Sequence, residues 1–195
     1  MEKASKVAIY PCGGVGFVLS SVARYAAYVV TEDMLPGQTE IVDAVRLISG
    51  IPDEIKLVEE NPSIILDGCA YQCGSNLFRL LGIKPAARIL LPPIAKMPPT
   101  FVCDCKKQET KLAPGTNRRV PGETGRNLAM EVATQAQNAC IAILNLNYPY
   151  ERQKVNCEQN IICDYVENIP KKMKYVTVNE RIERPEDMPA ILGLE

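Results

Sequence analysis

The sequence predicts an α/β protein with a three-layer, mostly parallel sheet of the Rossmann or flavodoxin-like kind. Short apolar, β-branched runs alternate along the chain with segments of helical spacing, which is typical of a parallel sheet covered on both faces. The run Ser63–Leu66 is apolar after its serine and therefore suits a strand buried on both faces. The length of 195 residues suits one sizeable domain. We expect residues 1–146 to form this domain and residues 147–195 to form a C-terminal extension packed on it.

Local patterns predict the individual elements in chain order. Lys6–Tyr10 reads as the first strand, and the apolar segment Phe17–Thr31 as a buried helix. After a turn at Pro36-Gly37, we expect a short strand within Thr39–Leu47. Proline and acidic residues open the helix expected at Pro52–Glu60. The remaining expected elements are a helix at Asn76–Leu81, a strand at Ala87–Leu91 closed by Pro92-Pro93, a helix at Glu123–Leu146 and a strand at Lys174–Ile182.

Three cysteines follow the first and central strands. Cys12 comes directly after Lys6–Tyr10 and Pro11, and Cys69 and Cys73 follow Ser63–Leu66. In an open α/β sheet, ligands gather outside the carboxyl ends of the strands, so we expect these thiols to converge there. If the turn after the central strand is already helical, the i, i+4 spacing puts Cys69 and Cys73 on one face. A helix N-terminus also favours thiolates. The alternative is that both cysteines pack as small buried hydrophobes.

Composition restricts the chemistry further. The chain has eight cysteines and no histidine, so a transition-metal site has to use thiolates, and Cys₂His₂ zinc, facial-triad iron and Ser-His-Asp or Cys-His catalysis are excluded. The net charge of −1 argues against nucleic acid or an anionic membrane as the main partner. The sequence shows neither a secretory signal nor an apolar run of the ~20 residues that span a bilayer. We therefore expect a cytoplasmic protein with reduced thiols.

A long proline-rich segment, Met97–Gly122, interrupts the alternation and carries Cys103 and Cys105. A stretch of this length without regular structure is usually a functional or a disordered loop. In an extended chain the two sulfurs of C-x-C point to the same side, so one metal site can take both. We expect one or both to join Cys12, Cys69 and Cys73. Such thiolates suit zinc or an iron–sulfur cluster, and the spacing does not decide between them.

Several residues around these cysteines have expected supporting roles. Gly13, Gly14 and Gly68 let the backbone approach a bound group closely. Asp67 can ligate, tune thiol reactivity or shape the turn, and we favour the last role. Cys140 lies within the long helix and reads as a core residue. The role of Cys157 and Cys163 is open, because they can form a second pair or be separate surface thiols.

The segments Pro11-Cys12-Gly13-Gly14 and Ile65–Gly74 (ILDGCAYQCG) resemble the DGC-domain family of bacteria and archaea. That family is named for the Asp-Gly-Cys that stands here as Asp67-Gly68-Cys69, and zinc binding has been inferred for it. The resemblance covers roughly Lys6–Cys105. It implies metal-binding cysteines at Cys12, Cys69, Cys73 and, by position, Cys105 or Cys103. It implies little about an activity.

Our leading hypothesis is a cytoplasmic metal-binding protein with a thiolate site, holding zinc or an iron–sulfur cluster, at the carboxyl edge of the sheet. The second hypothesis is a thiol or persulfide carrier, or an enzyme of sulfur or metal-cofactor metabolism, with Cys69 or Cys12 as nucleophile. The third is a non-catalytic assembly subunit that binds another protein. No catalytic residue is assigned beyond the nucleophile of the second hypothesis.

Overall fold

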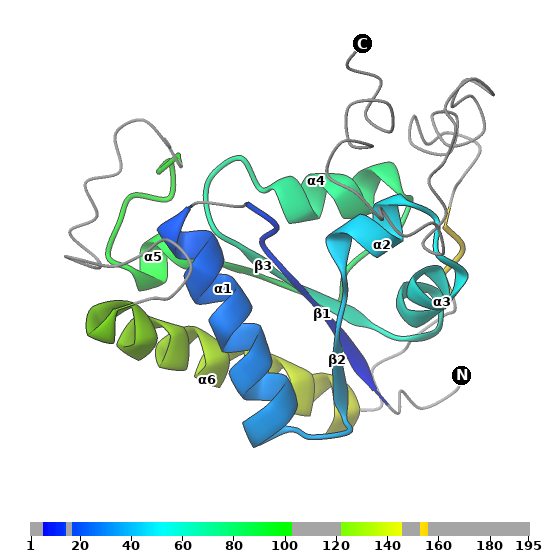
Figure 1. The fold of residues 1–195 in the computed structure, drawn as a ribbon, viewed down its shortest axis with the longest axis horizontal. Helices are drawn as coiled ribbons and strands as arrows, with labels where there is room; N and C mark the ends of the chain where they lie inside the picture. Colours follow the sequence, from blue (N-terminus) through cyan, green and yellow to red (C-terminus); the bar gives the residue numbers. More distant parts are fainter. Residues whose placement is uncertain (1–5, 15–16, 103–121, 146–152, 156–195) are drawn as a thin grey trace, which may run out of the picture.

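In the part of the chain that the structure describes, four parallel strands form a sheet at the centre of the protein (Figure 1). The computed structural model describes residues 6–14, 17–102, 122–145 and 153–155. The spatial order is β2-β1-β3-β4, so the two central strands are the first and third along the chain. The strands are β1 (Val7–Pro11), β2 (Thr39–Ile41), β3 (Ser63–Asp67) and β4 (Ala87–Leu90).

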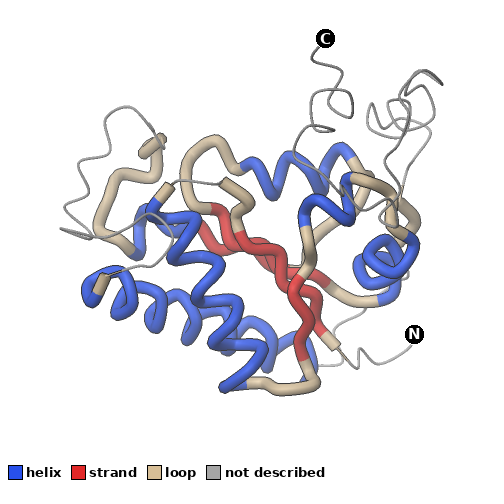
Figure 2. Tube along the Cα trace, viewed as in Figure 1, coloured by secondary structure: helices blue, strands red, loops and turns tan. Residues whose placement is uncertain are grey.

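Helices cover both faces of this sheet, as Figure 2 shows. The helical elements are α1 (Val18–Tyr28), the π-helical η1 (Val29–Met34), α2 (Ala44–Ile48), α3 (Pro52–Glu60), α4 (Cys73–Leu80), α5 (Leu91–Ile94) and α6 (Glu123–Asn145). Every residue of β1 and β3 is buried, because a parallel sheet with helices on both faces leaves its central strands no contact with water. The expected α/β fold is confirmed.

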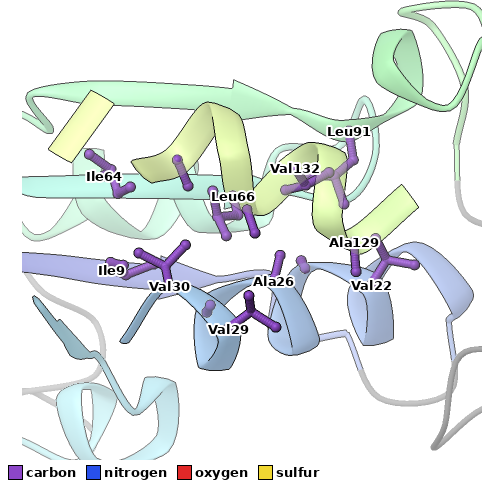
Figure 3. Close-up of a cluster of buried hydrophobic side chains, with 14 of the residues drawn as sticks. Ile9, Val22, Ala26, Val29, Val30, Ile64, Leu66, Leu91, Ala129 and Val132 are labelled. Atoms are coloured by element: carbon purple, nitrogen blue, oxygen red, sulfur yellow. The ribbon is translucent and has the colours of Figure 1, made fainter. Parts of the chain in front are cut away.

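One face of the sheet packs against α1, η1 and α6. Ile9 of β1 and Ile64 and Leu66 of β3 enter a cluster with apolar residues of these helices (Figure 3). The side of α6 that faces this cluster repeats every three or four residues, at Leu128, Val132, Ala136, Cys140 and Ile143. The expectation that Cys140 is a core residue is therefore confirmed.

The opposite face packs against α3 and α4. Alternate residues of the strands point to this side, and Tyr10 and Ile65 join a second cluster with Val58 of α3 and Phe78 of α4. The rings of Tyr10 and Phe78 meet edge to face, with centroids 5.2 Å apart. Each face of the sheet thus has its own core, which gives the protein three layers.

The structure differs from the expected elements at several places. Within Thr39–Leu47 the strand stops at Ile41, because Asp43 accepts hydrogen bonds from the N–H groups of Val45 and Arg46 and so caps α2. The buried helix expected to end at Thr31 continues as η1 to Met34. Leu91, expected at the end of a strand, begins α5 instead, since prolines are compatible with a first helical turn.

Other expectations fall largely outside the described residues. These are most of the loop Met97–Gly122, the strand at Lys174–Ile182, and Cys157 and Cys163. Of the C-terminal extension, Val155 is buried and donates its backbone N–H to Glu59 of α3, while the boundary at residue 146 stays a prediction. In the described part of the chain, no helix has the length and apolar character needed to cross a membrane.

Stability should fall at high pH partly because of Cys140. Burial raises the pKa of its thiol from 9.0 to about 12. The unfolded chain therefore loses this proton first, so the stabilisation is complete below pH 9 and is lost as the pH rises towards 12. Between pH 8 and pH 10, Cys140 should account for about 1.4 kcal/mol of the lost free energy of unfolding.

Urea unfolding of Cys140→Ala at both pH values, in reductant, tests this expectation. The variant should lose less stability than the wild type over the interval. Val132→Ala, on the same helix face and without a titratable group, is the matched control and should lose as much as the wild type. Equal pH dependence in all three proteins would contradict the assignment.

Candidate functional site at the carboxyl edge of the sheet

The strand order places the loops after β1 and β3 side by side. These strands are neighbours, with Pro11 paired to Leu66, and the helices that follow them, α1 and α4, cover opposite faces of the sheet. The two loops therefore diverge at a switch in strand order, which is where open α/β sheets bind ligands. Cys12 follows β1 and Cys69 lies two residues after β3, as the sequence predicted.

Cys12 is held in a narrow space between α1 and the loop after β3. Its N–H donates to the carbonyl oxygen of Leu66 at 2.9 Å, and its Sγ lies 3.3 Å from Oγ of Ser20. A Cβ atom at Gly68 would stand only 3.2 Å from this sulfur. A glycine at position 68 therefore lets the two loops approach each other around the thiol. Only 6% of Cys12 is exposed.

Cys69 and Cys73 lie in different environments. Cys69 is 6% exposed and precedes the helix, whereas Cys73 is exposed and is the first residue of α4. Gln72 between them has a φ of 50° in the left-handed region, which separates the turn from the helix. The condition for helical spacing to put both thiols on one face, a turn that is already helical at Cys69, is therefore not met. The helix nevertheless begins three residues before the expected Asn76.

Asp67 joins the end of β3 to the start of α4. This carboxylate is fully buried and accepts hydrogen bonds from the N–H of Gly74 and the hydroxyl of Ser75. Burial raises the pKa of Asp67, while the bonds from Ser75 and Gly74 and the charge of Arg88 act in the opposite direction. The turn-shaping role expected for Asp67 agrees with these contacts.

The thiols influence one another electrostatically. Burial raises the pKa of Cys73, and the neighbouring Cys12, Cys69 and Asp67 raise it further. The pKa of Tyr10 is raised to about 12, mainly by burial and further by the nearby Cys12, Asp67 and Cys73. Ionised thiols would repel one another at this edge of the sheet, so a stable set of thiolates here calls for a cation.

Within the described residues, no three cysteine, aspartate or glutamate side chains stand in a position to hold one metal ion. Cys103 and Cys105, the remaining expected ligands, lie outside these residues. The chain that leads to them does reach the site, because the N–H of Ala70 donates to the carbonyl oxygen of Phe101 at 2.8 Å. The donor chemistry thus fits a soft metal, and a complete ligand set stays a prediction.

The glycine turn after β1 has two different roles. A Cβ atom at Gly14 would stand 2.7 Å from Oγ of Ser20, so packing within the protein requires a glycine there. A Cβ atom at Gly13 would meet its nearest atoms only at 3.8 Å. A bound group therefore has room to approach the backbone at Gly13, as expected. At Gly14 and Gly68, the space that a side chain would need is already occupied by Ser20 and Cys12.

Sequence reasoning missed Ser20 and Arg24, two residues of α1 that contact this turn. The Arg24 guanidinium donates to the carbonyl oxygens of Cys12 and Gly14 and to the hydroxyl of Ser21. The signal that could have found them is the presence of polar side chains on an otherwise apolar helix of the first strand–turn–helix unit.

Removing the Asp67 carboxylate should destabilise the fold. Asp67→Ala leaves the N–H of Gly74 without its acceptor in a buried place, which should cost about 2 kcal/mol of unfolding free energy. Asp67→Asn keeps an acceptor and should cost less. Asp53→Ala removes an exposed carboxylate from the first turn of α3 and serves as the control. Urea unfolding measures all three variants, and equal stability of Asp67→Ala and Asp53→Ala would contradict the role.

The comparisons with known proteins identify a family. Comparison with curated proteins and with solved structures gives no significant match. A family model described as the DGC domain matches residues 8–110, a range that includes Cys12, Cys69, Cys73, Cys103 and Cys105. The match covers more than half of the chain, and the protein belongs to the DGC domain family.

Proposed function

We propose that this protein is a cytoplasmic metal-binding protein whose site lies at the carboxyl edge of the sheet. Cys12, Cys69 and Cys73 are the proposed thiolate ligands, and Cys103 or Cys105 completes the set. Zinc and an iron–sulfur cluster are the two candidates for the bound group, since both take thiolate ligands. The observation that carries the proposal is the meeting of two cysteine-bearing loops at the switch in strand order.

Electrostatics supports a positively charged occupant. Cys12, Cys69 and Asp67 all oppose ionisation of Cys73, and a metal ion at the same place reverses this effect because it stabilises the thiolate form. Gathering these groups is unfavourable in the metal-free protein when they ionise, and a bound metal ion would offset that repulsion.

The position of Phe101 supports the contribution of the loop cysteines. Its carbonyl oxygen is bonded to the residue that follows Cys69, and its side chain packs against the core beneath α1 and α6. Cys103 is two residues further along, and two residues of extended chain span at most about 7 Å. The thiol of Cys103 is thus within reach of the Cys69 turn.

A thiol or persulfide carrier is the second candidate, with Cys69 or Cys12 as nucleophile. Both are 6% exposed, and a nucleophilic cysteine needs access to its substrate. This burial favours a metal ligand over a carrier that delivers sulfur to another protein. No contact in the described part of the chain favours the third candidate, an assembly subunit.

Single replacements of the proposed ligands should lower the metal content. Cys12→Ser, Cys69→Ser and Cys73→Ser each remove one soft ligand, so protein purified without oxygen should hold less than half of the wild-type metal. Cys140→Ala removes a core thiol that is not among the proposed ligands, and should keep the wild-type content. Elemental analysis measures the metal, and visible absorption distinguishes a brown cluster from colourless zinc. Equal metal in all four variants would refute the site.

Replacing both loop cysteines tests the closure of the site. The double variant Cys103→Ser, Cys105→Ser should bind metal at least tenfold more weakly, because a ligand set of three remains. Competition with a chromophoric chelator measures the affinity, and the single variants show which of the two thiols binds. Wild-type affinity in the double variant would mean that the loop thiols are not ligands and that the site has an open coordination position.

A further inference from the structure

A cavity of about 550 Å³ adjoins Cys12 on the side away from β3. Pro11 and Ile41, at the carboxyl ends of β1 and β2, line it together with Arg24 and Tyr28 of α1 and with Asp43 and Ala44 at the start of α2. Its volume is in the range of pockets that bind small molecules. Cys12 itself lines the cavity, whereas the other proposed metal ligands, Cys69 and Cys73, follow β3 on the opposite side of β1.

Arg24 supplies the positive charge of the cavity. Its Nη1 donates to the carbonyl oxygens of Cys12 at 3.4 Å and Gly14 at 3.2 Å, and its Nη2 donates to Ser21 at 3.1 Å. A guanidinium has five N–H groups, so these three acceptors do not use all of its donors. No carboxylate in the described part of the chain forms an ion pair with Arg24. Its charge and remaining donors are therefore available to an anion.

The other lining groups limit which anion fits. Asp43, which also lines the cavity, is a carboxylate and would repel a dianion such as phosphate more strongly than a singly charged anion. The N–H groups of Val45 and Arg46 are already bonded to Asp43, so α2 offers them to no ligand. The remaining lining residues include the aliphatic Ile41 and Ala44, both partly exposed, which suit an apolar ligand body.

We propose that this cavity binds a small monocarboxylate with a short branched apolar body. The carboxylate lies against Arg24, which can offer two N–H donors to it, and the apolar body lies against Ile41 and Ala44. This assignment does not rest on the metal site, because Arg24, Ile41 and Ala44 are not among the proposed metal ligands. It places an organic ligand next to the backbone of Cys12, on the opposite side of β1 from Cys69.

The test uses the full chain and three probes: 3-methylbutanoate, the uncharged 3-methylbutanamide, and inorganic phosphate. Calorimetric titration should show the carboxylate binding at least tenfold more tightly than either of the others. Arg24→Gln should weaken carboxylate binding at least tenfold. Arg24→Lys should weaken it less, since lysine keeps the positive charge but lacks the paired N–H donors of the guanidinium. Ala44→Leu should also abolish binding, because it fills the cavity while retaining Arg24.

Val45→Leu is the matched control, because Val45 is the next residue of α2, is 72% exposed and does not line the cavity. It should bind the carboxylate like the wild type. The proposal is overturned if the carboxylate and amide bind equally, if phosphate binds as tightly as the carboxylate, or if Ala44→Leu binds like Val45→Leu. If Arg24→Gln does not fold, the comparison of Ala44→Leu with Val45→Leu still tests the proposal. Metal analysis of the same samples separates the two proposals, since Ala44→Leu should keep its metal.

Discussion

The pairing of β1 with β3 is the interaction on which the rest of this structure depends. Their parallel register, in which Pro11 lies beside Leu66, buries both strands on both faces. Alternate side chains then supply the two cores, with Ile9 and Ile64 on one face and Tyr10 and Ile65 on the other. The same pairing brings the loops after β1 and β3 together. Core and candidate site are thus two results of one strand contact.

Close packing around Cys12 explains why the loops at this edge contain glycines and small polar residues. Ser20 lies 3.3 Å from the sulfur, and side chains at Gly14 or Gly68 would collide with Ser20 or crowd Cys12. The protein therefore buries a thiol next to a hydroxyl where an apolar core residue would be the simpler solution. Such an arrangement restricts access from solvent and keeps the sulfur in a fixed position, which suits a ligand better than an exposed nucleophile.

The two sides of β1 offer different chemistry. Towards β3, the neighbouring groups of Cys12 are the thiols Cys69 and Cys73 and the buried Asp67, all of which become negative on ionisation. Towards β2, the backbone of Cys12 accepts a hydrogen bond from Arg24, whose cationic side chain lines the cavity. The proposed soft cation complements the first side, and the proposed small organic anion complements the second. Arg24 also fixes the turn that carries Cys12, so ligand binding in the cavity would act on the same loop.

The sequence by itself determined the alternation of strands and helices, the buried central strand and the placement of Cys12 and Cys69 after two of the strands. These features depend on local periodicity and on turn residues, which act over a few positions. The tertiary structure alone decided the strand order, the separation of Cys73 from Cys69 by the left-handed Gln72, and the contacts of Ser20 and Arg24 with the Cys12 turn. The contacts of α1 arise between residues eight to twelve positions apart, and the cavity needs β2 and α2 as well. No local sequence pattern predicts such contacts, because they form only when the helix packs on the sheet.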